Sequence, residues 1–318
     1  MFYKLLKLPA RLAFYFYCRK LITNNREIFK SGGPLLIAAN HPNSFLDAIL
    51  LATLFKQPVH SLTRGDVFAN PFYSKILHRL NMLPVYRISE GAANLGYNYN
   101  TFNECLEVFK KNGIVLIFSE GRCINEWHLR ALKKGTARLA MSAWQQGIPL
   151  KIIPLGINYS SFRIFGKNIV LNWGDLIYQK DIGEDIYTGR AINLFNEIVQ
   201  AQLKKLVIEI NGADKKEIEK TFYIYQSAAK KIILFIPSIL GWLLHFPLYK
   251  TVEFFIRKRA NDHYDSIMVG LLFFLYPVYL LIITIAVYLF TKNLSALLLI
   301  LVIPFTAWSL LQLKRQVK

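Results

Sequence analysis

The sequence predicts an α/β domain with a largely parallel sheet flanked by helices, followed by a C-terminal transmembrane helical hairpin. Three observations lead to this fold class. Short apolar segments alternate with longer helical ones from about residue 32 to residue 211, two long uncharged runs lie near the C-terminus, and the 318 residues are 53% hydrophobic but only 19% charged. Soluble domains are usually about 45–50% apolar and about 25% charged, so this chain is too apolar to be wholly soluble.

The chain is also strongly basic, with 39 lysines and arginines against 20 acidic residues and a net charge of +19. Its apolar content excludes disordered and fibrous classes. Such a charge balance indicates nucleic acid, an anionic membrane surface or a phosphorylated substrate as partner. The cysteines, Cys18, Cys105 and Cys123, are widely spaced without a metal-ligand pattern, so a reducing compartment is expected rather than a disulfide scaffold.

Residues 1–30 are predicted to form a basic amphipathic segment on the membrane surface. Basic residues alternate there with leucines and aromatic residues, a pattern typical of a helix that lies on an anionic leaflet. A signal peptide would need an unbroken apolar core and a small-residue cleavage site, and neither is expected here. The alternative is a helix packed on the following domain, with Pro9 in the middle of the pattern in either case.

Residues 31–225 are predicted to form the α/β domain, because strand and helix signals alternate along them. The expected strands are Leu35–Ala39, Val59–Thr63, Met82–Tyr86, Ile114–Phe118, Lys151–Leu155 and Ile169–Trp173. The expected helices are Ser44–Phe55, Pro71–Leu80, Asn98–Asn112, Lys134–Gln146 and Gly189–Ile210. Active sites of such sheets lie beyond the carboxyl ends of the strands, so the residues that follow each strand are the candidates for chemistry.

The C-terminal part carries the membrane prediction. Residues 266–318 hold two uncharged runs, Ser266–Phe290 and Leu294–Leu313, each long enough to cross a hydrocarbon core of about 30 Å. Residues 226–265 are predicted to be interfacial or re-entrant, because prolines interrupt the shorter apolar segment 231–250, although a third span is an alternative. Basic residues flank the hairpin on both sides, which predicts a cytoplasmic location for everything N-terminal to it.

One histidine, one carboxylate and several arginines follow the predicted strands. Asn40 and His41 come after the first, Arg64 after the second and Arg87 after the third. The fourth strand is followed by the run Glu120-Gly121-Arg122. A histidine can remove a hydroxyl proton, a carboxylate can fix its tautomer, and arginines match phosphate oxygens. The set suits acyl transfer to a phosphorylated acceptor.

These residues form four segments that resemble the motifs of the membrane-associated glycerolipid acyltransferases, the PlsC-like family. The segments, in chain order, are Asn40-His41-Pro42-Asn43-Ser44-Phe45-Leu46-Asp47; Arg64-Gly65-Asp66-Val67-Phe68 with Pro71-Phe72 and Leu83-Pro84-Val85-Tyr86-Arg87; Phe118-Ser119-Glu120-Gly121-Arg122; and Lys134-Gly135-Thr136-Ala137 with Ile153-Pro154-Leu155. The resemblance covers about residues 35–158, and four motifs in the right order are far more specific than any one.

The resemblance implies a role for each site residue. His41 is the general base for the acceptor hydroxyl, and Asp47 orients and stabilises the imidazolium. Arg87 holds the acceptor phosphate with Arg64 beside it, while Glu120 and Gly121 shape the acceptor site. The family's third-motif arginine falls one place early here, at Arg122, which is a further candidate for substrate binding. Direct attack on an acyl thioester is implied, without a covalent enzyme intermediate; Cys123 as an acyl-carrying nucleophile is the alternative.

The first motif departs from the family pattern, because five residues rather than four separate His41 from Asp47. On one helix, positions six apart would point about 240° away from each other. The run Ser44-Phe45-Leu46-Asp47 has the form of a capping box, so we expect Ser44 to cap a helix, with His41 in the preceding loop, which absorbs the extra residue. The alternative is that Asp47 only caps the helix.

The sequence therefore predicts an O-acyltransferase that acylates glycerol 3-phosphate or lysophosphatidic acid in phospholipid biosynthesis at the cytoplasmic face of a membrane. Acyl-coenzyme A or acyl-carrier protein is the expected co-substrate, membrane lipids and the phosphorylated glycerol acceptor are the expected partners, and no cofactor or metal is expected. Nucleic acid is not expected as a partner, because no recognised nucleic-acid motif is present. The alternatives are a catalytically silent protein that binds anionic lipid and an acyltransferase for another lysolipid or an amino lipid.

Overall fold

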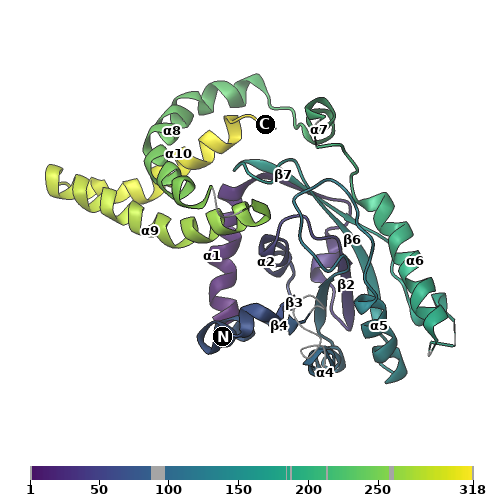
Figure 1. The fold of residues 1–318 in the computed structure, drawn as a ribbon. Coiled ribbons are helices and arrows are strands. Elements are labelled where there is room, and N and C mark those ends of the chain that lie inside the picture. The colour runs from purple at the N-terminus through teal and green to yellow at the C-terminus, as the bar shows by residue number, and fades with distance from the viewer. Residues whose placement is uncertain are drawn as a thin grey trace. The chain divides into compact units, whose positions relative to one another are not determined.

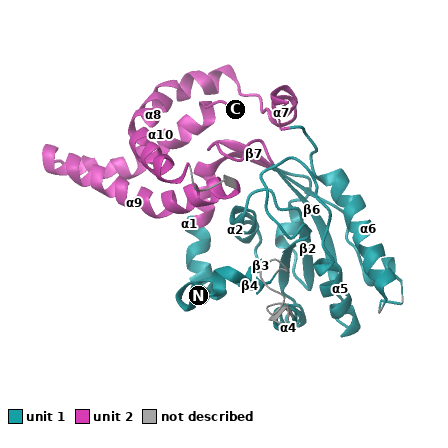
Figure 2. Ribbon diagram, in the orientation of Figure 1, with its two compact units in different colours: residues 1–9, 22–158, 170–211 teal, residues 10–21, 159–169, 212–318 magenta. Residues whose placement is uncertain are grey.

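The computed structural model describes residues 2–86, 97–183, 185–186, 188–212, 214–257 and 261–316. The chain divides into two compact units (Figure 2). Unit 1 consists of residues 1–9, 22–158 and 170–211, and unit 2 of residues 10–21, 159–169 and 212–318. The candidate catalytic residues belong to unit 1, and the long apolar helices belong to unit 2.

The sheet has seven strands among the described residues, in the order β1-β7-β6-β2-β5-β3-β4. The strands are β1 Cys18–Thr23, β2 Leu35–Ala39, β3 Val59–Arg64, β4 Met82–Val85, β5 Ile114–Phe118, β6 Lys151–Tyr159 and β7 Lys167–Trp173. The pairs that join β6, β2, β5, β3 and β4 are all parallel, which confirms the largely parallel sheet. Ala39 at the end of β2 lies level with Phe118 of β5 and Leu155 of β6, so the residues that follow these strands share one edge.

Helices cover both faces of the sheet in unit 1 (Figure 1). They are α2 Phe45–Leu54, α3 Pro71–Arg79, α4 Tyr97–Lys110, α5 Gly135–Gln145 and α6 Gly189–Leu206. Side chains of a strand alternate between the two faces, and the residues Leu36, Ala38 and Val115 share one buried cluster with apolar residues of α4, α5 and α6. The other face receives α2, in which Leu46, Leu50 and Leu51 are buried for the same reason.

The N-terminal helix is shorter than the sequence pattern predicts. Helix α1 runs from Phe2 to Tyr17, through Pro9, and the chain then forms strand β1. The basic and apolar residues of Cys18–Thr23 give no clear alternation, so the strand depends on its neighbour β7 in the sheet rather than on local sequence.

Unit 2 contains the helices α7 Lys215–Phe222, α8 Ala228–Ile256, α9 Tyr264–Thr291 and α10 Leu299–Leu313. In the described part of the chain, three segments are long and apolar enough to cross a membrane: 228–256, 264–291 and 294–313. Residues 231–250 are helical throughout, because α8 continues through Pro237 and Pro247, and their interfacial or re-entrant location stays a prediction. Apolar helices tolerate proline where neighbouring groups satisfy the freed carbonyls.

Helix α10 packs mainly along α8 rather than along α9, its partner in the predicted hairpin. Gly241 of α8 permits this contact, because a Cβ atom there would lie 2.1 Å from the carbonyl oxygen of Thr306 in α10. Small residues allow the backbones of apolar helices to approach closely.

Replacing Gly241 with leucine should therefore separate α8 from α10. We expect the purified protein in detergent to lose about 1–3 kcal/mol of stability, because the added side chain cannot fit at this crossing. Thermal unfolding measures the effect. The control is Gly189→Leu, at a glycine with nothing within 4 Å of the added Cβ. Equal unfolding temperatures for the two variants would contradict the close packing.

A buried ion pair lies in unit 2 next to the first turn of α9. Lys167 of β7 and Asp265 of α9 form a salt bridge, and both side chains are 0% exposed. The hydroxyl of Tyr17 donates a hydrogen bond to Asp265 Oδ2 at 3.0 Å, and the Lys167 ammonium lies over the Tyr17 ring. Burial lowers the pKa of Lys167, and the neighbouring Asp265 acts in the opposite direction. The three residues join α1, β7 and α9.

Candidate active site

The loop after β2 is tied to the neighbouring strand at its first residue. The side chain of Asn40 donates to the carbonyl oxygen of Ile157 at 3.0 Å and accepts from the Ile157 amide at 2.7 Å. Asn40 is 3% exposed, so this two-way contact replaces a backbone pair beyond the end of β2. His41, the next residue, therefore begins at a fixed point of the sheet edge.

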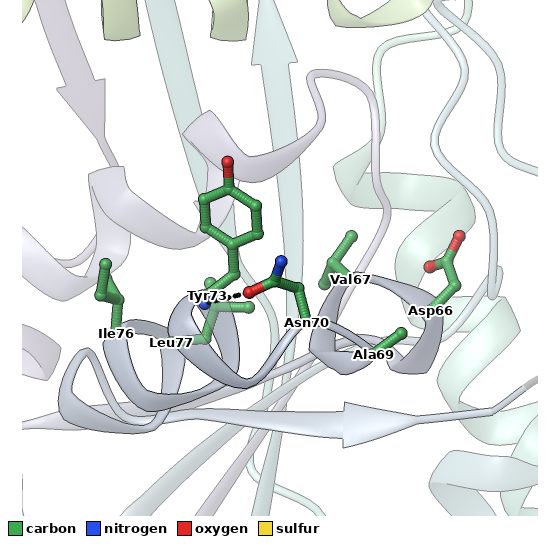
Figure 3. A pocket seen from close by; sticks show the side chains of 7 residues that line it. All are labelled: Asp66, Val67, Ala69, Asn70, Tyr73, Ile76 and Leu77. Atoms are coloured by element: carbon green, nitrogen blue, oxygen red, sulfur yellow. Dashed lines mark hydrogen bonds between the residues drawn. The ribbon is translucent and has the colours of Figure 1, made fainter.

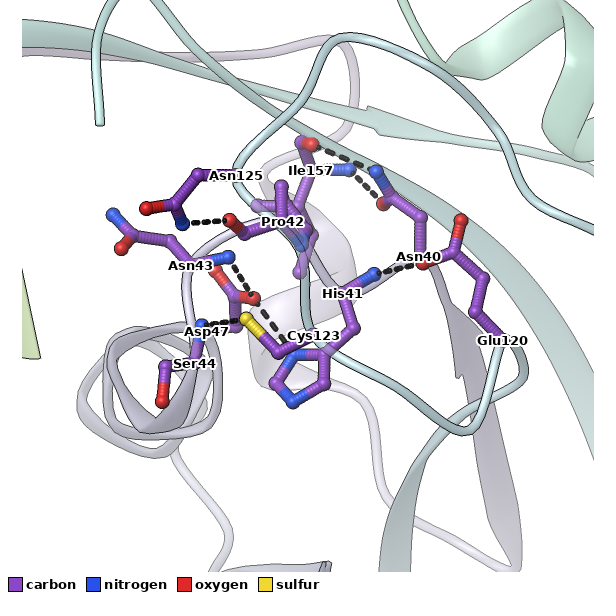
Figure 4. Close-up of polar contacts among 10 residues, drawn as sticks. All are labelled: Asn40, His41, Pro42, Asn43, Ser44, Asp47, Glu120, Cys123, Asn125 and Ile157. Atoms are coloured by element: carbon purple, nitrogen blue, oxygen red, sulfur yellow. Dashed lines mark hydrogen bonds and ion pairs between the residues drawn. The ribbon is translucent and has the colours of Figure 1, made fainter. Parts of the chain in front are cut away.

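His41 and Asp47 are in direct contact (Figure 4). His41 Nδ1 lies 2.9 Å from Asp47 Oδ2, which also accepts the Asn43 amide at 2.9 Å. The Asp47 side chain is 0% exposed and the His41 side chain is 15% exposed. Because an ionised carboxylate only accepts, Nδ1 carries a proton in this contact, and Nε2 is the ring atom that can accept another.

The imidazole of His41 is held flat against Phe118, the last residue of β5. The two ring centroids are 3.7 Å apart and the ring planes differ by 10°. The contact fixes the plane of the imidazole, while Asp47 fixes its rotation. Phe118 was part of a predicted motif, but its contact with His41 follows only from the parallel pairing of β2 with β5.

The extra residue between His41 and Asp47 is absorbed in the loop, as predicted. Ser44 stands immediately before α2 with φ 53° and ψ −145°, a conformation that L-residues rarely adopt. The predicted capping box is not formed, because the Ser44 side chain makes no capping hydrogen bond. The carboxylate of Asp47 instead receives the Asn43 amide and His41 Nδ1, which are closer in this backbone path.

Glu120 joins this loop to the loop after β5. Its Oε2 accepts the His41 amide at 2.9 Å, and its Oε1 accepts the Arg130 amide at 2.9 Å. Glu120 is 5% exposed, and burial raises the pKa of its carboxyl against the opposing effect of the two N–H groups. Both oxygens therefore hold backbone in place. Gly121 follows with φ +67°, a turn that favours glycine.

Two further hydrogen bonds fasten the loops together. The Ile124 amide donates to the His41 carbonyl oxygen at 3.3 Å, and the Asn125 side chain donates to the Pro42 carbonyl oxygen at 2.7 Å. Asn40, Asn43 and Asn125 were not predicted as site residues. Their signal in the sequence is weak, because an amide side chain after a strand is common in any loop.

The arginines differ in how far the structure describes them. Arg64 is the last residue of β3, and its half-exposed guanidinium forms an ion pair with Asp66. Arg122 is exposed on the loop after β5. Arg87 lies outside the described residues. Because β3 pairs in parallel with β5, Arg64 belongs to the same sheet edge as His41 and Glu120.

An apolar groove of about 410 Å³ begins two residues after Arg64 (Figure 3). Its lining comes from the turn 65–68 and helix α3, and consists of Asp66, Val67, Ala69, Asn70, Tyr73, Ile76 and Leu77. The described residues contain no group of three or more histidine, cysteine or acidic side chains placed to hold a metal ion. The site thus combines a histidine–aspartate pair, exposed guanidinium groups and a neighbouring apolar groove.

Comparison with known proteins shows what the domain that carries this site resembles. The acyltransferase family model matches residues 20–158. Two chloroplastic 1-acyl-sn-glycerol-3-phosphate acyltransferases, BAT2 of Brassica napus and LPAT1 of Arabidopsis thaliana, are each 24% identical over 191 residues, or 60% of this chain. The matches cover 52% and 50% of these proteins, so the chain spans about half the length of the curated relatives it matches.

A solved structure is also similar, the crystal structure of the 1-acyl-sn-glycerophosphate acyltransferase PlsC from Thermotoga maritima. It is 15% identical, with a TM-score of 0.47, over 64% of this chain and 78% of that chain. The residues that match the acyltransferase family model, 20–158, include His41, Asp47 and Glu120. The family model and the two plant relatives thus show a likeness to glycerolipid acyltransferases, as the four motifs predict.

Proposed function

We propose that the chain is a membrane-bound O-acyltransferase that transfers a fatty acyl group from a thioester to the hydroxyl of lysophosphatidic acid in phospholipid biosynthesis. The observation that carries the proposal is the 2.9 Å contact between His41 Nδ1 and buried Asp47, within the domain that matches the acyltransferase family. The two plant relatives are 1-acyl-sn-glycerol-3-phosphate acyltransferases by name, which favours lysophosphatidic acid over glycerol 3-phosphate as acceptor.

His41 acts as the general base in this proposal. Its Nε2 accepts the proton of the acceptor hydroxyl as the oxygen attacks the thioester carbonyl carbon, and Asp47 stabilises the imidazolium that forms. The tetrahedral intermediate then collapses, the carbon–sulfur bond breaks, and the imidazolium returns the proton to the leaving thiolate. The products are an ester and a free thiol, and neither a cofactor nor a metal ion takes part in these steps.

Arg64, Arg87 and Arg122 are proposed to bind the acceptor phosphate, since guanidinium groups pair with phosphate oxygens in two parallel hydrogen bonds. Glu120 and Gly121 contribute by fixing the two loops that carry His41 and Arg122. The apolar groove beside Arg64 suits the hydrocarbon part of a lipid substrate. Acyl-coenzyme A or acyl-carrier protein is the proposed donor.

Replacing Arg87 with alanine should raise the KM for lysophosphatidic acid by about tenfold or more with little change in kcat, since a hydrogen bond to a charged group contributes about 1.5–3 kcal/mol. Arg64→Ala should raise the KM less, because the Arg64 guanidinium already forms an ion pair with Asp66. Arg190→Ala, at the exposed start of α6, is the control. Steady-state kinetics measure kcat and KM. An unchanged KM in Arg87→Ala would show that another residue binds the acceptor phosphate.

The proposed location is a membrane with unit 1 on the cytoplasmic side. Three segments long and apolar enough to cross a membrane support the membrane location. The basic residues that flank them support the cytoplasmic orientation of unit 1. The net charge of +19 would attract anionic lipid and the phosphates of coenzyme A, or the acidic surface of acyl-carrier protein.

A panel of four pairs tests the substrate class: lysophosphatidic acid and glycerol 3-phosphate, each with acyl-coenzyme A and acyl-carrier protein. We expect thioester consumption that depends on lysophosphatidic acid. Thioester consumption only with another lysolipid or an amino lipid would identify that lipid, rather than lysophosphatidic acid, as the acceptor. The catalytically silent, lipid-binding alternative predicts no thioester consumption at all. The His41–Asp47 contact supports the enzyme over this alternative, because the two residues meet despite the unusual spacing that would favour a silent protein.

A further inference from the structure

We propose that Cys123 is a positioning residue for the His41–Asp47 pair. Its sulfur accepts the Ser44 amide at 2.9 Å, and this hydrogen bond holds the long loop in the path that brings Asp47 to His41 (Figure 4). The proposal deepens the proposed function, on which its kinetic part rests. It assigns to Cys123 a role other than that of a nucleophile.

The need for such a contact follows from the geometry of the loop. Residues six apart on a continuous helix would point about 120° away from each other (a rotation of about 240°), so His41 and Asp47 can meet only if the chain leaves the helical path between them. Residues 41–44 lie outside α2, and Ser44 among them has a φ of 53°. A residue held in such a conformation is strained and persists only where its surroundings fix it.

The surroundings that fix Ser44 include the loop after β5. Three neighbouring residues of that loop contact the first motif: Cys123 contacts Ser44, Ile124 contacts His41, and Asn125 contacts Pro42. In the contacts of Ile124 and Asn125 the loop after β5 is the donor, whereas at Cys123 it is the acceptor. The sulfur therefore gives the Ser44 amide a hydrogen-bond acceptor at the start of α2, where backbone N–H groups lack helical partners.

Cys123 also differs from the other two cysteines. Burial raises the pKa of the Cys18 and Cys105 thiols to about 12. Cys105 is 0% exposed in the core of unit 1, whereas Cys123 is partly exposed and its sulfur accepts the Ser44 amide of the first motif. Cys105→Ala is therefore a matched control, with the same chemical change in the same unit.

The experiment compares Cys123→Ala, which removes the acceptor, with Cys123→Ser, which keeps one. In the full-length protein we expect Cys123→Ala to lower kcat by about tenfold with KM changed less than threefold, because the Ser44 amide loses its hydrogen-bond acceptor and the loop no longer holds Asp47 in place. Cys123→Ser should recover kcat to within about threefold of the parent, on the same scale of energies. Cys105→Ala should leave kcat unchanged.

A second measurement does not depend on activity. Hydrogen–deuterium exchange of the peptide that covers residues 41–47 should become faster in Cys123→Ala and stay at the parent rate in Cys123→Ser and Cys105→Ala. Unchanged exchange in Cys123→Ala would overturn the positioning role even if the protein transferred no acyl group, so this arm separates failure of the inference from failure of the proposed function. Loss of turnover in Cys123→Ser, with an acyl group retained on Cys123 in the parent, would establish the nucleophile instead.

Discussion

Replacing His41 with alanine is expected to lower kcat for acyl transfer by about 10²–10⁴-fold, the usual contribution of a positioned general base. The acceptor hydroxyl would keep its proton, because the alanine side chain has no atom that accepts it. Folding should be preserved, because the His41 backbone remains bonded to Glu120 and Ile124. Steady-state kinetics at saturating acceptor measure the loss.

Two companion variants sharpen this prediction. Asp47→Asn keeps the shape of the side chain but loses its charge, so kcat should again fall strongly. His128→Ala is the control, since His128 is an exposed histidine paired with Glu209 in the same unit, and it should retain the parent kcat. Turnover of His41→Ala within tenfold of the parent would remove the general-base assignment.

Replacing Lys167 with methionine is expected to produce the largest loss of stability, about 3–5 kcal/mol. The change leaves the Asp265 carboxylate fully buried without its counter-ion, and an uncompensated buried charge costs about that much. Tyr17 can still donate one hydrogen bond to Asp265, but a neutral hydroxyl does not replace a cation. Thermal unfolding of the purified protein in detergent gives the measurement.

A double variant separates the charge from the packing. Lys167→Met with Asp265→Leu removes both ions and fills the space with apolar atoms, so it should recover most of the lost stability. The control is Lys110→Met, which breaks the exposed pair with Glu107 and should cost at most about 1 kcal/mol. A double variant no more stable than the single one would show that packing, rather than charge, dominates at this position.

The α/β core could be predicted closely from sequence because its signals are local. Strands β2 and β5 are short uninterrupted apolar runs and have the predicted bounds, Leu35–Ala39 and Ile114–Phe118. The meeting of His41 with Glu120 followed from the same logic, since parallel neighbours bring their carboxyl ends to one edge. The loop position of His41 also followed, because Ser44 could be recognised as the residue before a helix.

Other features depend on tertiary contacts that local sequence does not reveal. Strand β1 is formed against β7, and α8 remains helical through two prolines because it belongs to a group of packed apolar helices. The Lys167–Asp265 pair joins residues 98 positions apart, and the Ser44–Cys123 contact joins residues 79 apart. The carboxylate of Asp47 was predicted in a capping box, but the positive φ of Ser44 directs the backbone so that Asp47 receives the Asn43 amide.

We propose that His41 and Asp47 catalyse acyl transfer to a phosphorylated acceptor at a membrane. The most direct measurement is the appearance of phosphatidic acid when the purified protein, in lipid nanodiscs, receives lysophosphatidic acid together with an acyl thioester. We predict that one ester forms for each thiol released and that both products depend on the acceptor. Thiol release without the ester, or no release with either acyl-coenzyme A or acyl-carrier protein, would contradict the account.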